Sequence, residues 1–455
     1  GGHQFGYWAG QLGDGRAINL GEVLGVNQTR WEIQIKGAGR TAFSRSGDGR
    51  AVLRSSIREF LGSEFMFAVN IPTSRALTLS GSQASSVTRD QFYDGNIQDE
   101  PGAMVLRMAP TWIRFGTFEL FASRGDTDSL KALADFVLRH FYPFIGQIAE
   151  DQGSCPYTSL LIEVSKRTGR LFARWQAIGF VHGVLNTDNL SILGITIDFG
   201  PYAFMDRFNQ DFVPNTSDDE ARYSYRNQPK IGAWNLEKLV EAMAPILKGG
   251  EFNGPVIVEH YWNAFRIEYR RVMLDRMLLM DADPKEDDAI IQSLLDWMFN
   301  TEADFPRTFA GIERAAQAWT KQKDPDSQIS ESELNSVLAW AVVEDLKDEE
   351  KQEIRLWLHQ YKKRFLERNT CSFNRAGSSC TPKIMPNSLY QPRNYLMHEA
   401  IEAASSGNLQ PLQSLFEAVM NPSTQIKSTD LHEKLSASPP RWALKRGISQ
   451  LSCSS

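Results

Sequence analysis

The sequence predicts an α+β protein with two lobes and a helical C-terminal extension. Residues 1–120 are rich in Gly, Arg and residues that favour strands, whereas apolar residues recur at helical spacing through 127–180 and 236–320. The chain has 455 residues, 42% hydrophobic and 23% charged, which is a globular composition with room for about two or three domains or lobes. We therefore expect a first lobe over 1–120, a second over 121–320, and a helical extension ending in a mobile, cysteine-containing tail over 321–455.

Composition argues against several classes of protein. The net charge of −6 does not suit a general nucleic-acid-binding protein. The first 60 residues differ, because they hold eight Lys or Arg against five Asp or Glu, a local excess that suits a polyphosphate ligand. Four cysteines are too few for a disulfide framework, and no apolar run approaches the ~18 residues of a membrane span. The chain opens without Met and reads like the middle of a domain, so we expect its N-terminus and any targeting segment to lie upstream.

Each element of the first lobe has its own periodicity. Residues 31–37 (WEIQIKG) alternate apolar and polar side chains, which predicts a strand. From Ala51 to Ala68 the apolar residues fall on one helical face, which predicts a helix. Further strands are expected at 73–81 and 102–108.

The rest of the chain is dominated by helical periodicity. Short apolar pieces broken by Gly, Asn and Asp over 181–200 are typical of a site built from loops between strands. The remaining segments are predicted as follows: helices through 127–180, with one at 160–178; helices through 236–320; a solvated linker and exposed helix at 322–353; a loop at 368–385; a helical stretch at 393–420; an extended or mobile end at 421–455.

The segment HGVLNTDNLSILGITIDFG (182–200) carries the clearest chemical motif. A protein-kinase catalytic loop reads H-R-D-L-x-x-x-N and is followed by a strand and then by D-F-G. Here Asn189 follows His182 by seven residues, 192–197 is the expected strand, and Asp198 begins the Asp-Phe-Gly. In that layout the Asn and the Asp hold Mg²⁺ against the phosphates of ATP. The motif favours a protein-kinase-like fold; the alternative is a pair of buried polar residues at a strand end.

One position in this motif departs from the kinase pattern. Val184 stands where a kinase has its catalytic base, and a valine cannot accept a proton. Either the protein catalyses no reaction or another group serves as the base. Asp188 is the nearest carboxylate and could reach the attacking hydroxyl, or it could simply cap a loop.

The N-terminal part of the chain supplies a second set of kinase-like features. Lys36 ends the predicted strand and Glu59 lies on the next predicted helix, as in the Lys–Glu pair that grips phosphates in kinases. Two Gly-Asp-Gly-Arg turns, at 13–16 and 47–50, could let backbone N–H groups and an Arg approach phosphate oxygens. Taken singly, each of these features has a simpler interpretation as a surface charge or an ordinary turn.

Two arginines complete the set of candidates. Arg107 and Arg114 flank an apolar run and could clamp the terminal phosphate of a nucleotide. The alternative is a salt bridge between the lobes. The ordered set of Lys36, Glu59 and the 182–200 motif makes chance agreement improbable.

Four segments of the chain resemble one known family. They are GGHQFGYWAGQLGDGRA, IQIKGAGRTAFSRSGDGRAVLRSSIREFL, HGVLNTDNLSILGITIDFGPYAF and the later QPRNYL. They resemble the selenoprotein O family, the YdiU-like protein adenylyltransferases, and the similarity runs along nearly the whole chain. The resemblance implies a pseudokinase fold that binds ATP in a flipped orientation and transfers AMP, not phosphate, to Ser, Thr or Tyr hydroxyls of proteins.

The resemblance also implies roles for individual residues. Asp188 matches the proton acceptor, and Asn189 and Asp198 match the metal ligands. With ATP reversed, the kinase base is no longer beside the attacked phosphorus, so Val184 becomes tolerable. The positions that match nucleotide contacts are Gly13, Gly15, Arg16, Lys36, Asp48, Gly49, Glu59, Arg107, Arg114 and Asp198.

The expected ligands and partners follow from this resemblance. They are ATP as substrate, Mg²⁺ or Mn²⁺, and protein substrates with free hydroxyls, without nucleic acid or membrane. Eukaryotic members are mitochondrial, so we expect a mitochondrial protein. Two alternatives remain. A protein phosphotransferase would share every ATP ligand but is disfavoured by Val184. A non-catalytic ATP-binding scaffold would not need both the metal pair and the Lys–Glu pair.

The end of the chain adds a detail. Eukaryotic members of the family often carry selenocysteine third from the C-terminus, and this chain ends Cys453-Ser454-Ser455. Cys453 either replaces selenocysteine or stands for it. Some members also place a Cys after D-F-G for a regulatory disulfide, and Pro214 stands there in this chain, which argues against redox gating through that loop.

Overall fold

We obtained a computed structural model of the chain. It describes residues 1–455 except 92–93, 152, 248–253, 280–282, 321, 323, 342–343, 374–384, 446 and 453–455, and it describes residues 83, 84, 150 and 368–373 by their backbone alone.

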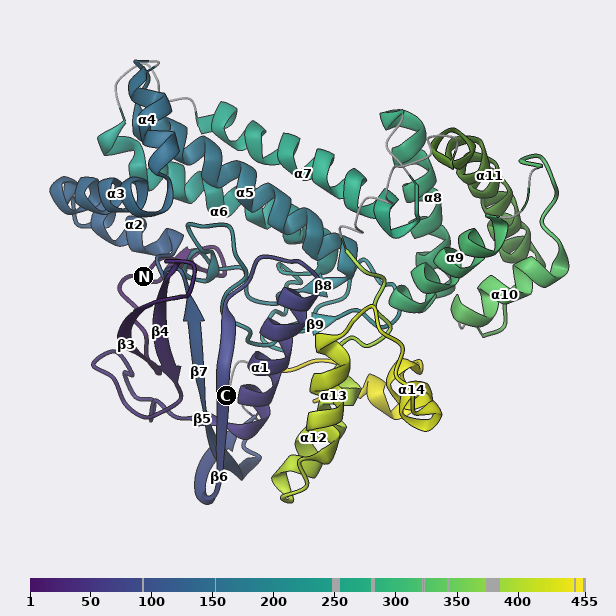
Figure 1. The fold of residues 1–455 in the computed structure, drawn as a ribbon. Helices are drawn as coiled ribbons and strands as arrows, with labels where there is room; N and C mark the ends of the chain where they lie inside the picture. The colour runs from purple at the N-terminus through teal and green to yellow at the C-terminus, as the bar shows by residue number, and fades with distance from the viewer. Residues whose placement is uncertain are drawn as a thin grey trace.

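The N-terminal part of the molecule is an antiparallel sheet (Figure 1). The central strand is β7. It pairs with β4 and β5 along one edge and with β6 along the other, which gives the order β3-β4-β7-β5 with β6 on the second edge of β7. The five strands are β3 (Ala17–Leu24), β4 (Arg30–Lys36), β5 (Ala51–Val52), β6 (Arg75–Asp90) and β7 (Ile97–Ala109). The strands predicted at 31–37, 73–81 and 102–108 are thus confirmed.

The buried face of β4 is its polar one. Glu32, Gln34 and Lys36 are buried, whereas the apolar residues between them are only partly covered. The register places Gln34 opposite Arg107 on β7. A strand normally buries its apolar face against the core. Here the polar face is covered because it points toward the 182–200 segment, where Lys36 contacts Asp198. The strand therefore presents charged groups to the candidate site.

Helix α1 (Leu53–Ala68) packs against the sheet and confirms the predicted helix. Ile57, Leu61 and Phe65 have no solvent-accessible surface and belong to the main hydrophobic core. Helices α12 and α13 also pack on α1, and the Phe60 and Phe416 rings lie 5.1 Å apart. Helix α1 is therefore clamped between the sheet and the C-terminal helices (Figure 1).

Helices make up most of the remaining structure. Helix α5 packs against α6 and α7 and ends at Gly179, whose φ of 76° allows the left-handed turn that stops the helix. The helices in this part are α2 (Phe115–Ser123), α3 (Thr127–Phe141), α4 (Pro143–Asp151), α5 (Pro156–Ile178), α6 (Gln228–Met243), α7 (Gly254–Arg276), α8 (Pro284–Thr301) and α9 (Phe305–Trp319). They confirm the helical periodicity of 127–180 and 236–320.

The C-terminal region contains five more helices in its described part. They are α10 (Glu331–Ala341), α11 (Asp348–Phe373), α12 (Asn394–Ser405), α13 (Gln410–Met420) and α14 (Thr429–Ser436). Two short antiparallel strand pairs complete the described fold: β1 (His3–Gln4) with β2 (Tyr7–Trp8), and β8 (Phe180–Val181) with β9 (Ala203–Phe204).

Two predictions for the C-terminal region need correction, and a third is confirmed with added detail. The helix in 322–353 is not simply exposed, because its apolar residues Leu334 and Val337 are buried against α9. The helical stretch predicted at 393–420 is confirmed and consists of two helices, since Gly407 between them adopts a φ of 90°. Part of 368–385 is helical, as α11 continues to Phe373, and the rest lies largely outside the described residues.

The end of the chain, 421–455, is predicted to be extended or mobile, and in the part that the structure describes it is not simply extended. It contains α14, and Leu451 is buried and pairs in parallel with Asn215. Apolar burial of Leu451 and backbone hydrogen bonds to 214–216 hold the segment in place. Cys453 lies outside the described residues. Within the described part of the chain, we find no helix that combines the length and apolarity needed to traverse a bilayer.

Candidate active site

The segment 182–200 folds as a loop rather than as strand and loop. The strand predicted at 192–197 is wrong, because Gly194 adopts a φ of 66° and its N–H bonds to the Ser191 carbonyl, which reverses the chain. The segment is tied down by single bridges instead, from Ser191 to Arg114 and from Thr196 to Thr73. The loop is thereby fixed against two segments of the N-terminal part.

His182 holds the two halves of this loop together. It is buried, and its Nε2 donates to the Ile197 carbonyl at 3.1 Å while its Nδ1 accepts from the Val184 N–H at 3.4 Å. Burial lowers the pKa of His182, which keeps the ring neutral, as this pair of bonds requires. His182 therefore joins the start of the loop to the residue just before Asp198.

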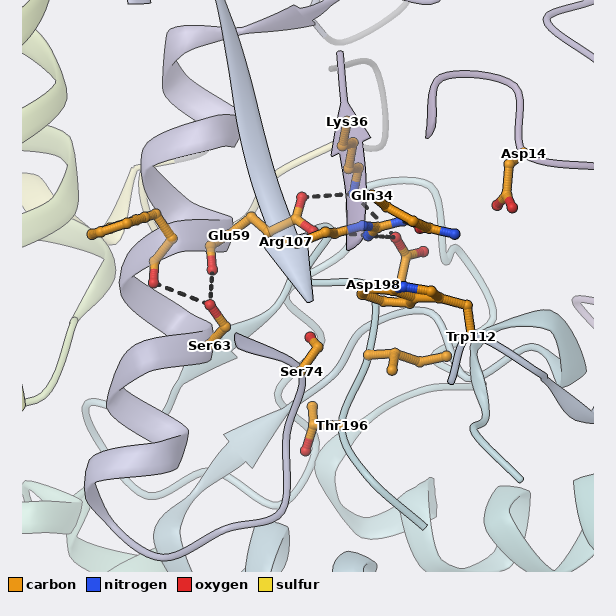
Figure 2. A network of polar contacts seen from close by, with 12 residues as sticks. Asp14, Gln34, Lys36, Glu59, Ser63, Ser74, Arg107, Trp112, Thr196 and Asp198 are labelled. Atoms are coloured by element: carbon orange, nitrogen blue, oxygen red, sulfur yellow. Dashed lines mark hydrogen bonds and ion pairs between the residues drawn. The ribbon is translucent and has the colours of Figure 1, made fainter. Parts of the chain in front are cut away.

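Lys36 and Glu59, predicted as a pair, are in contact in the structure (Figure 2). The Lys36 Nζ lies 2.7 Å from Glu59 Oε2 and 3.1 Å from Asp198 Oδ1. Arg107 contributes a second cation, with its Nη1 2.9 Å from Glu59 Oε1 and 3.9 Å from Asp198 Oδ1. Asp198 adopts a φ of 61°, a backbone conformation rarely taken by a residue with a side chain and often found at functional positions. We call these four residues the charged cluster.

The cations keep both carboxylates of the charged cluster ionised. Burial acts to raise the pKa of Asp198, but Lys36, Arg114 and Arg107 outweigh it and hold that pKa well below its ordinary value. Burial likewise acts to raise the pKa of Glu59, and Lys36 and Arg107 lower it overall. The site therefore presents an anionic Asp198 surrounded by cations, which is suited to a metal ion and phosphates together.

The two predicted clamp arginines occupy different positions. Arg107 is only 3% exposed; its second Nη donates to Gln34 at 3.1 Å, and its guanidinium stacks 4.4 Å above the Trp112 ring. Arg114 donates to the backbone carbonyl of Asp188 at 2.7 Å and lies 3.5 Å from Asp14. Arg107 thus forms the inner wall of the site, and Arg114 links the 182–200 loop to the first Gly-Asp-Gly-Arg turn.

The first Gly-Asp-Gly-Arg turn lies beside the charged cluster. Gly13 has a φ of 68° and a side chain there would collide with Phe43, so only glycine fits. Thr41 Oγ1 donates to the Asp14 carbonyl at 2.7 Å, which anchors the turn to the following loop. Arg16 is near enough to help lower the pKa of Asp198, which connects Gly13, Gly15 and Arg16 to the site.

The second turn lies apart from the charged cluster in the described contacts. The carboxylate of Asp48 receives two hydrogen bonds of 2.9 Å from Arg89, and Arg89 lowers its pKa. Gly49 has a φ of 68° and packs against Gly39, where a side chain would not fit. Asp48 and Gly49 thus shape the loop between β4 and β5, and their predicted contact with nucleotide stays a prediction.

Asp188 and Asn189 lie in one 3-10 turn, Thr187–Asn189. Gln4 Nε2 donates to Asp188 Oδ2 at 2.9 Å, while Oδ1 is buried without a hydrogen-bond partner among the described residues. Burial raises the pKa of Asp188, although Arg114 and Gln4 act against it. Asp188 therefore has one restrained oxygen and one oxygen able to accept a proton.

The donor set fits a magnesium ion that shares its coordination with phosphates. Asn189 donates its amide nitrogen to the Val184 carbonyl at 3.0 Å, which leaves its amide oxygen as the atom for a metal. Asp198 supplies an ionised carboxylate. Among the described residues no group of three or more His, Cys, Asp or Glu could hold a metal by protein ligands alone. Two oxygen ligands are typical of Mg²⁺ bound together with a nucleotide.

Two residues of the site were not identified from sequence. Gln34 follows from a signal that was present, because strand alternation places it on the same face as Lys36. Gln4 had no local signal beyond its place in a family-like segment, since its partner Asp188 is 184 residues away.

Comparisons with known proteins bear on the whole chain. It is 41% identical over 462 residues to the protein nucleotidyltransferase YdiU of Xanthomonas campestris pv. campestris (strain 8004), covering 100% of this chain and 83% of the relative. The same identity and coverage hold for the YdiU proteins of Tolumonas auensis over 460 residues and Azoarcus sp. (strain BH72) over 463 residues. The family described as "Protein adenylyltransferase SelO" matches residues 1–420. The resemblance predicted from the motifs is confirmed, and the chain belongs to the SelO family of protein adenylyltransferases.

Proposed function

We propose that this protein transfers AMP from ATP to Ser, Thr or Tyr hydroxyls of other proteins and releases pyrophosphate. Membership of the family makes it a nucleotidyltransferase with ATP as its substrate. The observation that carries the proposal is the charged cluster, in which ionised Asp198 lies 3.1 Å from Lys36. In the same 182–200 loop, Val184 occupies the position of the kinase base, and the carboxylate available as a base is that of Asp188. This is nucleotide-binding machinery without the kinase base.

The fold proposed for this function is the two-lobed, protein-kinase-like one. Support comes from a strand lysine paired with a glutamate on the helix that covers the sheet, and from a D-F-G aspartate facing that lysine. The lobes would be 1–120 and 121–320, with 321–455 as the helical extension. The nucleotide would lie where β4, α1 and the 182–200 loop meet.

The chain's own residues account for each requirement of the reaction. Lys36, Arg107 and Arg114 supply positive charge for the triphosphate, and Glu59 holds Lys36 in place. The substrate hydroxyl oxygen attacks the α-phosphorus, and the bond from that phosphorus to the oxygen bridging to the β-phosphate breaks. Asp188 takes the hydroxyl proton, and pyrophosphate leaves.

A magnesium or manganese ion would be held by Asn189 and Asp198. When bound, such an ion neutralises phosphate charge and stabilises the charge that develops on the departing pyrophosphate. The protein's contribution is the ionised state of Asp198, maintained by Lys36 and the neighbouring arginines, and the fixed amide of Asn189.

The flipped nucleotide explains the distribution of charge. In this pose the β- and γ-phosphates point inward, toward the buried Arg107 and toward Arg114, and the α-phosphate lies by the entrance. The alternative, phosphate transfer, would need a base beside the γ-phosphate, where this chain has Val184. A non-catalytic scaffold would have no use for the uncommitted oxygen of Asp188.

One experiment separates the three functions. The protein is incubated with α-labelled ATP and, in parallel, with γ-labelled ATP, using itself and a protein mixture as acceptors. We expect protein to carry label after incubation with α-labelled ATP and to carry none after incubation with γ-labelled ATP. Label from γ-ATP would establish phosphorylation instead, and absence of both labels from wild type would indicate a scaffold. The Asp198→Ala variant serves as the background control.

The location of the protein stays a prediction. A mitochondrial location rests on the resemblance to eukaryotic members, whereas the relatives described above are bacterial. Imaging of the full-length tagged protein in its own cells tests it.

A further inference from the structure

The N-terminal hairpin contacts the 182–200 loop directly. Its strands are β1 and β2, with His3 paired to Trp8. The His3 N–H donates to Thr187 Oγ1 at 2.7 Å, and the Phe5 N–H donates to Asn186 Oδ1 at 3.1 Å. Gln4, between them, donates to Asp188. Three consecutive residues of the hairpin thus meet the three consecutive residues 186–188.

The hairpin is anchored by contacts that do not involve Gln4. The His3 ring pairs with Glu119 of α2 and makes an edge contact with Trp234 at 5.5 Å between ring centroids. The Phe5 N–H also bonds to the Tyr223 hydroxyl at 2.9 Å. Because these contacts fix the hairpin on their own, the Gln4 side chain can be changed without releasing it.

Gln4 controls the one part of Asp188 that other contacts leave unrestrained. Arg114 bonds to the Asp188 backbone carbonyl and so fixes the main chain, not the carboxylate. In the part of the chain that the structure describes, Gln4 is the only side chain that hydrogen-bonds to the carboxylate, through Oδ2. Rotation about the last bond of an aspartate has a broad energy profile, so such a group takes its orientation from its partners.

We propose that Gln4 is a positioning residue that, by holding Oδ2, fixes the orientation of the Asp188 carboxylate that takes the proton of the acceptor hydroxyl. This inference rests on the proposed function, in which Asp188 is the base. An amide suits the task because it donates one hydrogen bond without bringing a charge. A lysine or arginine would form an ion pair and compete for both oxygens, and a glutamate would repel the carboxylate.

The test replaces Gln4 with methionine, which has a similar length and no donor. Misorientation of a catalytic group can cost up to about 100-fold in rate. We expect kcat for AMP transfer to fall about 10- to 100-fold in Gln4→Met, with KM and Kd for ATP and the melting temperature unchanged. Gln410→Met, on the exposed surface of α13, is the matched control and should leave all four quantities unchanged. A wild-type kcat for Gln4→Met would overturn the inference.

A double-mutant cycle shows whether Gln4 acts through Asp188. If it does, Gln4→Met combined with Asp188→Asn is no slower than Asp188→Asn alone, because the group being positioned is already gone. If the two effects multiply, Gln4 acts elsewhere and the inference fails. The proposed function has its own outcome: a wild-type rate for Asp188→Asn would remove Asp188 as base, whereas a slow Asp188→Asn with a normal Gln4→Met would overturn only the role of Gln4.

Discussion

Lys36 and Glu59 form a buried ion pair, with 2.7 Å between Nζ and Oε2, although one lies on a central strand and the other on the helix that covers the sheet. The pair does not stand alone. Asp198 lies 3.1 Å from the same ammonium, and Arg107 holds the second oxygen of Glu59. Two cations and two anions therefore neutralise one another inside the protein, and their mutual attraction offsets the free-energy cost of removing them from water.

Replacement of Lys36 by methionine should abolish AMP transfer and leave the protein folded. Glu59 keeps its bond to Arg107, so the variant does not leave an isolated buried charge. We expect a loss of about 1–3 kcal/mol in the free energy of unfolding, measured by urea denaturation, and no detectable transfer. Lys363→Met, which removes a surface ion pair with Asp326, is the control and should keep full activity. Unfolding of Lys36→Met would mean that Lys36 is chiefly structural.

Removal of the proposed metal ligands should have unequal effects. Asp198→Ala removes a charged ligand and should eliminate most activity at every Mg²⁺ concentration. Asn189→Ala removes a neutral ligand, so its activity should recover in part as Mg²⁺ is raised. AMP transfer measured across a Mg²⁺ titration, with excess EDTA as the zero point, distinguishes the two. Asp211→Ala, at an exposed ion pair with Arg226, is the control. Near-wild-type activity of Asp198→Ala would contradict the assignment.

Arg107 and Arg114 should discriminate ATP from AMP. Loss of one charge-assisted contact to the γ-phosphate costs about 1.5–3 kcal/mol, or roughly 10- to 150-fold in affinity. The affinities of wild type, Arg107→Ala and Arg114→Ala for ATP, ADP and AMP can be compared by calorimetry. We expect a large deficit with ATP and a much smaller one with AMP.

The two variants should differ in stability. Arg107→Ala removes the hydrogen bonds to Glu59 Oε1 and to the amide oxygen of Gln34 inside the protein, although Glu59 keeps its ion pair with Lys36, whereas Arg114→Ala loses one backbone contact and a partner of Asp14. Arg107→Ala should therefore melt at the lower temperature. Equal losses of AMP and ATP affinity in both variants would mean that neither arginine reads the γ-phosphate.

A triad of charged side chains predicts a pH dependence of stability. Arg393 donates to both oxygens of Asp304, at 2.9 and 2.8 Å, and lies 3.4 Å from Asp206. Burial raises the pKa of Asp206 to about 6; Arg393, already committed to Asp304, lowers it only in part, and the Asp304 charge raises it further. The folded pKa exceeds the unfolded one. Asp206 thus stabilises the fold at low pH, and this contribution is lost as pH rises through about 6.

Asp206→Asn should remove that pH dependence. The neutral amide carries no ionisation cost, so the variant should gain on the order of 1 kcal/mol in free energy of unfolding relative to wild type at pH 7.5. The gain should shrink toward pH 4.5, where Asp206 is already protonated. Chemical denaturation of both proteins at the two pH values measures the difference. A constant difference between them would show that Asp206 does not titrate in this range.

Local sequence patterns determined the elements and the family, as particular residues illustrate. Alternation over 31–37 and helical spacing over 51–68 predicted β4 and α1, because backbone geometry alone decides which side chains share a face. Motif spacing placed Asn189 and Asp198 in one loop. The identity and order of these residues along the chain were sufficient to identify the family.

Tertiary structure alone decided which faces are buried and which distant residues meet. The polar face of β4 is the covered one, since its neighbour is a charged site rather than an apolar layer. The expected strand at 192–197 became a turn, because Gly194 and bridges to the N-terminal part outweighed its strand propensity. Leu451 is held against Asn215, and Gln4 reaches Asp188 across 184 residues. Such contacts depend on the packing of whole elements, and no local period of the sequence encodes them.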